Sequence, residues 1–158
     1  MFHSRSLACK KPYGAAPAGM KVEFAAYPRR EQGISRMTLW VEEDGQQAEA
    51  YPMRWFGLAG ARDEYGASFT PPHAGLYWYW FTFDTADGPR FCARGYGGRC
   101  EVLDSMGDRF QLTVYDPSYQ PPRWFGEGIT YNIFPDRFCR DRDPVQPEGE
   151  GIAPRVLH

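Results

Sequence analysis

An all-β fold is predicted by three features of the sequence. The stretch 75–84 is the longest uninterrupted run of strand-favouring, mostly aromatic residues. Shorter stretches of alternating apolar and polar residues precede and follow it, separated by Gly, Pro and Asp turn signals. No stretch has a convincing helical period. Together these features predict an immunoglobulin-like β-sandwich of about seven strands in two packed sheets.

The central stretch is expected to form the strand around which the sandwich is organised. Side chains alternate between the two faces of a strand. One face therefore carries Tyr77, Tyr79, Phe81 and Phe83, and the other carries Leu76, Trp78, Trp80 and Thr82. We expect the first set to be buried between the sheets, because aromatic side chains gain most from burial. Its predicted neighbours are Val22, Phe24, Met37, Leu39, Leu112 and Val114.

The remaining strands are predicted from shorter alternating stretches. These are residues 20–27, 34–42, 47–53, 65–70, 90–94 and 109–115. Pro52 favours an edge position for the third of them, because proline cannot donate to a ladder. Residues 1–19 are interpreted as an irregular lead-in, 54–64 as a loop carrying Trp55 and Phe56, and 95–108 as a glycine-rich loop.

Two domains are predicted, because the pattern changes after Asp116. Residues 1–116 form the sandwich, and 117–127, with three prolines, form a linker. Residues 128–134 are one more apolar strand, followed by a charged stretch rich in Pro and Gly. We therefore interpret 128–158 as the truncated start of a second domain.

Composition and charge exclude several classes of function. The chain has 158 residues with a net charge of −2 and no long Lys/Arg block, so no nucleic-acid partner is expected. No apolar run is long enough for a membrane span, so no membrane partner is expected. The first residues lack the apolar centre of a signal peptide. We expect a cytoplasmic protein, or a secreted one if a signal peptide has been removed.

The four cysteines, Cys9, Cys92, Cys100 and Cys139, have no zinc-binding spacing. In a cytoplasmic protein, four reduced thiols are expected. The alternative is a cross-link between Cys92 and Cys100 across a hairpin.

A family resemblance is carried by Gly128-Ile129-Thr130-Tyr131-Asn132-Ile133-Phe134-Pro135-Asp136-Arg137-Phe138. This stretch resembles the first strand of the catalytic barrel in the α-amylase superfamily, glycoside hydrolase family 13. It is most similar to the neopullulanase, cyclomaltodextrinase and pullulanase-like branch. Enzymes of that branch carry an immunoglobulin-like domain before the barrel, whose last strands the segments 75–79, 95–98 and 110–115 resemble.

The resemblance implies that this chain is the N-terminal accessory part of an enzyme that hydrolyses α-glucosidic bonds in starch, pullulan or maltodextrin. It also implies a (β/α)8 barrel as partner, of which only the first strand is present. The catalytic carboxylates of such enzymes lie on later barrel strands, so the fragment itself is expected to be inactive. Its role would be to support the barrel, bind substrate or mediate dimerisation. The alternative is a stand-alone β-sandwich that mediates protein contacts, with no glycosidase partner.

The outward tryptophans are the candidate carbohydrate-binding residues. Trp40, on the second predicted strand, is expected to lie across from Trp78 or Trp80 if these strands are neighbours. Flat aromatic clusters bind α-glucan or maltooligosaccharide through the C–H faces of the sugar. The alternatives are that other parts of the protein cover the cluster, or that it forms a homodimer contact. Trp55 is an equal candidate because it is predicted to lie on a loop.

The resemblance also raises the question of a calcium site after the predicted barrel strand. Calcium is bound by the parent family just after the first barrel strand, where Asp141 and Asp143 offer oxygen ligands. Arg140 and Arg142 oppose a cation there, so no cofactor is expected in this fragment, and a calcium ion in the parent enzyme is left open.

Overall fold

The computed structural model describes residues 1–122, 124, 127–129 and 131–132. The chain divides into two compact units, Met1–Gln120 and Pro121–His158. Short 3-10 turns lie at Arg30–Gln32 and Tyr96–Gly98. The strands of the described residues are β1 (Lys10–Lys11), β2 (Ala16–Pro17), β3 (Val22–Ala26), β4 (Arg36–Glu43), β5 (Glu49–Pro52), β6 (Arg54–Ala59), β7 (Arg62–Phe69), β8 (Gly75–Thr85), β9 (Gly88–Arg94), β10 (Cys100–Leu103) and β11 (Phe110–Tyr115).

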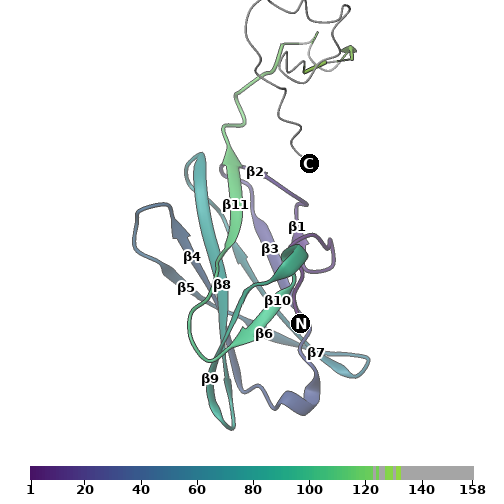
Figure 1. The fold of residues 1–158 in the computed structure, drawn as a ribbon, viewed down its shortest axis with the longest axis vertical. Coiled ribbons are helices and arrows are strands. Elements are labelled where there is room, and N and C mark those ends of the chain that lie inside the picture. The colour runs from purple at the N-terminus through teal and green to yellow at the C-terminus, as the bar shows by residue number, and fades with distance from the viewer. Residues whose placement is uncertain (123, 125–126, 130, 133–158) are drawn as a thin grey trace, which may run out of the picture. The chain divides into compact units, whose positions relative to one another are not determined.

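The larger sheet is built around β8, as predicted (Figure 1). Strand β4 pairs antiparallel with β8 along one edge. The other edge is divided between two strands, because β11 pairs with residues 75–79 and β9 pairs with residues 81–85. The sheet is extended by β5 on β4, by β10 on β9 and by the short parallel strand β2 on β11. Among the described strands β5 pairs with β4 alone, which confirms its predicted edge position.

The smaller sheet has the order β1-β3-β7-β6, with every pair antiparallel. Alternate residues of β3 are buried and its second and fourth residues point away from the core. In β7, Tyr65 and Phe69 are buried, and the Tyr65 hydroxyl donates to the carbonyl of Ile34 at 2.9 Å. The two sheets pack face to face, which confirms the all-β sandwich.

The core is aromatic, and β8 supplies its centre. The predicted inward set is buried, and Tyr79 and Phe81 have no exposed surface. The ring of Tyr79 stacks on Phe110 at 5.2 Å between centroids and lies 5.0 Å from Phe24. The predicted neighbours are also buried: Val22, Phe24, Met37, Leu39, Leu112 and Val114. The period-2 pattern therefore assigned the core face correctly.

The lead-in differs from its prediction, because it contributes strands and a core side chain. Residues 10–11 and 16–17 form β1 and β2. Phe2 is 4% exposed, and its ring lies 4.6 Å from Phe81 and 5.2 Å from Phe110 between centroids. The carbonyls of Met1 and Phe2 accept hydrogen bonds from the amides of Tyr27 and Cys100. No local period marks this segment, because its partners are distant in the sequence.

Two predicted loops contain strands. Residues 54–64 were expected to be a loop, but β6 and β7 form a hairpin that turns at Gly60, where φ is +64°. The register shifts between Trp55 and Gly57, and this irregularity breaks the alternation that marks a strand. Within residues 95–108, β10 pairs with β9 although it is short and largely exposed. Edge strands of this kind have a weak sequence signal, because only one of their edges is paired.

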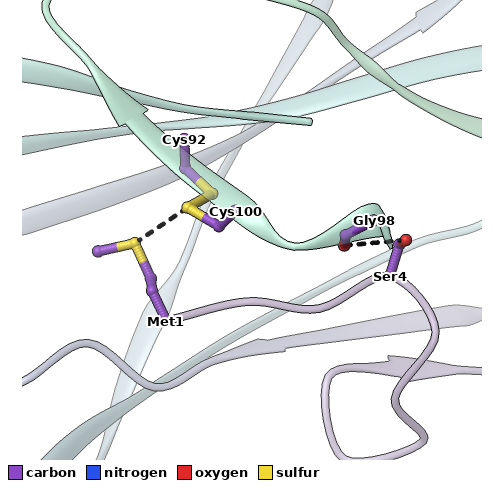
Figure 2. The surroundings of a disulfide bond; sticks show 5 residues. All are labelled: Met1, Ser4, Cys92, Gly98 and Cys100. Carbon is purple, nitrogen blue, oxygen red and sulfur yellow. Dashed lines mark hydrogen bonds between the residues drawn. A yellow bond between two sulfur atoms is a disulfide. The ribbon is translucent and has the colours of Figure 1, made fainter. Parts of the chain in front are cut away.

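The prediction of four reduced thiols is wrong for one pair, because Cys92 and Cys100 form a disulfide with 5.3 Å between their Cα atoms (Figure 2). Cys92 is buried in β9, and Cys100 begins β10. Figure 2 also shows Met1 beside Cys100, with 3.7 Å between their sulfur atoms. The hydroxyl of Ser4 donates to the carbonyl of Gly98 at 3.1 Å. The disulfide therefore closes the hairpin against which the first four residues pack.

The predicted barrel strand, residues 128–134, and the family motif, residues 133–138, lie mostly outside the described residues. Within this stretch the structure describes Gly128, Ile129, Tyr131 and Asn132.

No described helix is both long enough and apolar enough to span a bilayer.

Replacing Tyr79 tests the assignment of the core face. Tyr79→Ala is expected to lower the free energy of unfolding by about 3–5 kcal/mol, as for other buried aromatic residues. Urea melts of the two proteins measure this difference.

Tyr79→Phe is the matched control. The phenol oxygen is buried without a hydrogen-bond partner among the described residues, and burial raises the pKa of this phenol. Removing an unpaired hydroxyl while keeping the ring is expected to change stability by about 1 kcal/mol or less. A loss from Tyr79→Phe as large as that from Tyr79→Ala would contradict this account.

The thiol content tests the disulfide. Alkylation of the denatured protein, followed by mass spectrometry, is expected to label two more cysteines after reduction than before it. Cys100→Ser is expected to abolish the difference. Equal labelling with and without reductant would show that all four cysteines are reduced, as the sequence analysis expected. The outcome also bears on the expected cytoplasmic location, because disulfides persist mainly in oxidising compartments.

Candidate functional site

The outer face of the larger sheet brings two of the candidate tryptophans together. Trp40 on β4 and Trp80 on β8 are directly opposite each other in the register. Their rings are parallel within 5°, with centroids 6.2 Å apart. The indole N–H of Trp40 donates to the Thr82 hydroxyl at 2.9 Å. The expected meeting of Trp40 with a tryptophan of the central strand is therefore confirmed, with Trp80 as its partner.

Trp78 lies on the same face but in a polar setting. Its indole N–H donates to Asp44 Oδ1 at 2.7 Å, from the turn that follows β4. The guanidinium carbon of Arg109 lies 5.2 Å from the centre of the ring. Arg109 is held there because its Nη1 donates to Glu42 Oε2 at 2.6 Å, in a partly buried ion pair. A cation over the ring face is a favourable contact that also occupies the face on which a sugar would stack.

This geometry favours packing over an open platform. Trp80 is only 8% exposed, so little of its ring is available to a ligand. One face of Trp78 is occupied by Arg109. Sugar binding at Trp40, Trp78 and Trp80 stays a prediction. Trp78 is covered by Arg109, which directly precedes β11. The sequence analysis had expected a cover from the lead-in, from the Trp55–Phe56 segment or from the barrel.

Trp55 lies on the other sheet and on a strand, where a loop had been predicted. It is opposite Tyr65 in the β6–β7 pair and is 50% exposed. Its indole N–H donates to Asp63 Oδ1 at 3.0 Å, which fixes the direction of the ring. Carbohydrate contact at Trp55 also stays a prediction, and this residue is separated from the other three candidates by the thickness of the sandwich.

A feature that the sequence analysis missed is a hollow on the outer face of the smaller sheet, about 440 Å³ in volume. Phe56, which is 62% exposed, forms part of its wall, and Gly66 forms part of its floor. A Cβ atom at position 66 would come within 2.7 Å of Phe56 Cε2. The signal for this hollow is a glycine inside a strand, which often marks close approach of another group.

The calcium candidates Asp141 and Asp143 lie outside the described residues. In the part of the chain that the structure does describe, no cluster of three or more His, Cys, Asp or Glu side chains is arranged to hold a metal ion.

Removing Arg109 tests whether it covers Trp78. Arg109→Ala is expected to steepen quenching of tryptophan fluorescence by acrylamide and to lower stability by about 1 kcal/mol, because a cation–π contact is lost. Arg36→Ala is the control, since it removes an arginine of the same outer face that pairs with Asp84 at 3.9 Å. Identical quenching by the two variants would show that Trp78 is already open.

Comparison with known proteins gives similar regions in much longer enzymes, while no family model matches the chain. The amylopullulanases of Thermoanaerobacterium saccharolyticum, Thermoanaerobacter thermohydrosulfuricus and Thermoanaerobacterium thermosulfurigenes are each 27% identical over 160 residues. Each match covers 94% of this chain. The chain spans only 12%, 11% and 8% of the length of these three relatives, respectively.

Among solved structures, a cyclomaltodextrinase matches with a TM-score of 0.53 and 21% sequence identity. The match covers 89% of this chain and 24% of the cyclomaltodextrinase. At this level of identity, the likeness establishes a shared fold. The resemblance to pullulanase-like enzymes, inferred from residues 128–138 and the sandwich, is confirmed by the similarity to amylopullulanases, which extends over 94% of the chain.

Proposed function

We propose that this chain is the N-terminal accessory β-sandwich of an α-glucan-hydrolysing enzyme of the pullulanase type. One observation carries the proposal: similarity to amylopullulanases over 94% of the chain, which is a small part of each relative. The chain also shares its fold with a region of a cyclomaltodextrinase, which supports the same assignment.

Catalysis is assigned to a barrel encoded further along the same reading frame. Retaining and inverting glycosidases both use a pair of carboxylates that flank the scissile bond. In the described residues, the core between the sheets is apolar and aromatic, and the ion pairs lie outside it. The sandwich is therefore suited to support a catalytic domain. In this proposal its partner is the barrel, and α-glucan contact and self-association are further roles.

Two preparations test the proposal. The chain of 158 residues is expected to show no turnover of pullulan, starch or cyclodextrin. The protein translated from the complete reading frame is expected to hydrolyse at least one of them. Release of reducing sugar measures both.

Turnover by the 158-residue chain that survives repurification would contradict the assignment of catalysis to the barrel. A reading frame that ends at His158 would favour the alternative, a stand-alone sandwich that mediates protein contacts. Replacing the barrel-strand carboxylates of the complete protein by amides is the control for a contaminating glycosidase, because it should abolish hydrolysis.

A further inference from the structure

The hollow on the smaller sheet is formed because small residues face each other at its floor. Ala25 on β3 and Gly66 on β7 are register partners, and both lie on the outward face. The next outward pair on one side is Glu23 with Ser68. The sheet therefore has a depression in the middle of its outer face, with polar side chains beside it.

The walls of the hollow are apolar and come from opposite sides. The ring of Phe56, on β6, lies over Gly66, where a Cβ atom would come within 2.7 Å of Phe56 Cε2. Leu7, which is 58% exposed, lines the opposite side together with the segment that leads into β1. The volume of about 440 Å³ is within the range of small-molecule sites. An exposed aromatic ring beside a depression is a surface on which a flat apolar face can stack.

Phe56 differs from Trp78 in how its arginine is held. The guanidinium carbon of Arg54 lies 5.7 Å from the centre of the Phe56 ring. Whereas Arg109 is fixed by Glu42, Arg54 is exposed and has no ion pair among the described residues. A ligand can therefore displace Arg54 from the ring or accept hydrogen bonds from it.

Hydrogen-bonding groups of both kinds line the hollow. Glu64 accepts from the Tyr27 hydroxyl at 3.3 Å, and Glu23 pairs with Lys21 at 2.7 Å. Burial, and then the neighbouring Glu64 carboxylate, raise the pKa of Tyr27, so this phenol remains a donor. The Lys21 ammonium lowers the pKa of Glu23, so this carboxylate remains a charged acceptor.

Charged side chains of both signs surround the hollow. The carboxylates of Glu23 and Glu64 are matched by the ammonium groups of Lys11 and Lys21. The remaining lysine, Lys10, is buried, and its ammonium donates to the carbonyls of Pro12 and Gly14. Lys10 and the Arg54 guanidinium on the Phe56 ring leave the groups around the hollow with a small positive excess, but the Lys10 ammonium is held by two carbonyls. Donors and acceptors that alternate in this way, without a cluster of one charge, suit an uncharged polyhydroxylated ligand.

We propose that this hollow binds a short segment of α-glucan, with Phe56 stacking on a sugar ring and Glu23, Glu64 and Ser68 bonding its hydroxyl groups. The identity of the sugar rests on the proposed function, whereas the position of the site rests on the geometry of the smaller sheet. The site lies on the opposite sheet from Trp40, Trp78 and Trp80.

Titration of the ¹⁵N-labelled chain with maltoheptaose tests the proposal. Saturable amide shifts are expected at Ala25, Gly66 and Ser68, with a dissociation constant in the millimolar range. Phe56→Ala is expected to weaken binding at least ten-fold. Gly66→Val is expected to abolish it, because the added side chain fills the floor and displaces Phe56. If Gly66→Val fails to fold in urea melts, Phe56→Ala still decides the result.

Leu58→Ala is the matched control, because it removes another exposed apolar side chain of the same strand that does not line the hollow. This variant is expected to bind within two-fold of the parent chain. The proposal is overturned if no saturable shift occurs up to tens of millimolar, or if Leu58→Ala weakens binding while Phe56→Ala does not. Either result leaves the accessory role intact, since the hydrolysis assays decide that role separately.

Discussion

Pairing of β8 along both edges is the constraint on which the rest of the structure depends. One edge is taken by β4, and the other is divided between β11 and β9, so the strand is held by three partners. Because β8 is fixed in this way, its inward aromatic residues form the centre of the core. The side chains of Phe2, Phe24 and Phe110 pack against them from the lead-in, the opposite sheet and a neighbouring strand.

The same pairing decides what the outer face can do. Neighbouring strands crowd the outward tryptophans, so that Trp80 packs on Trp40 and Trp78 lies beneath Arg109. Large aromatic side chains in a fully paired sheet fill the space between one another. On the smaller sheet, Gly66 and Ala25 leave space that the Phe56 ring fills only in part, so that a hollow remains. The hollow therefore forms where the outward side chains are small, and not where aromatic side chains are most numerous.

In the proposed enzyme, catalysis and accessory functions belong to different domains. The chain occupies a small share of the amylopullulanases that it resembles, and it has a continuous apolar core of its own. Chemistry on a glycosidic bond requires two carboxylates on a framework that holds them at a set separation. In the proposed enzyme the barrel provides that framework, and the sandwich provides a stable neighbour with its own surface hollow.

The sequence alone determined the all-β class, the central strand and its buried face, because alternation with period 2 is a local property that any strand must satisfy. It also predicted that Trp40 would meet a tryptophan of β8, since an immunoglobulin-like topology makes their strands neighbours. The hairpin of β6 and β7 escaped notice because a bulge at Trp55 breaks the alternation. The burial of Phe2, the disulfide of Cys92 with Cys100 and the placement of Arg109 over Trp78 were decided only by the tertiary structure. Each depends on which strands become neighbours, and a contact such as that of Arg109 with Glu42, 67 residues apart, leaves no local pattern in the chain.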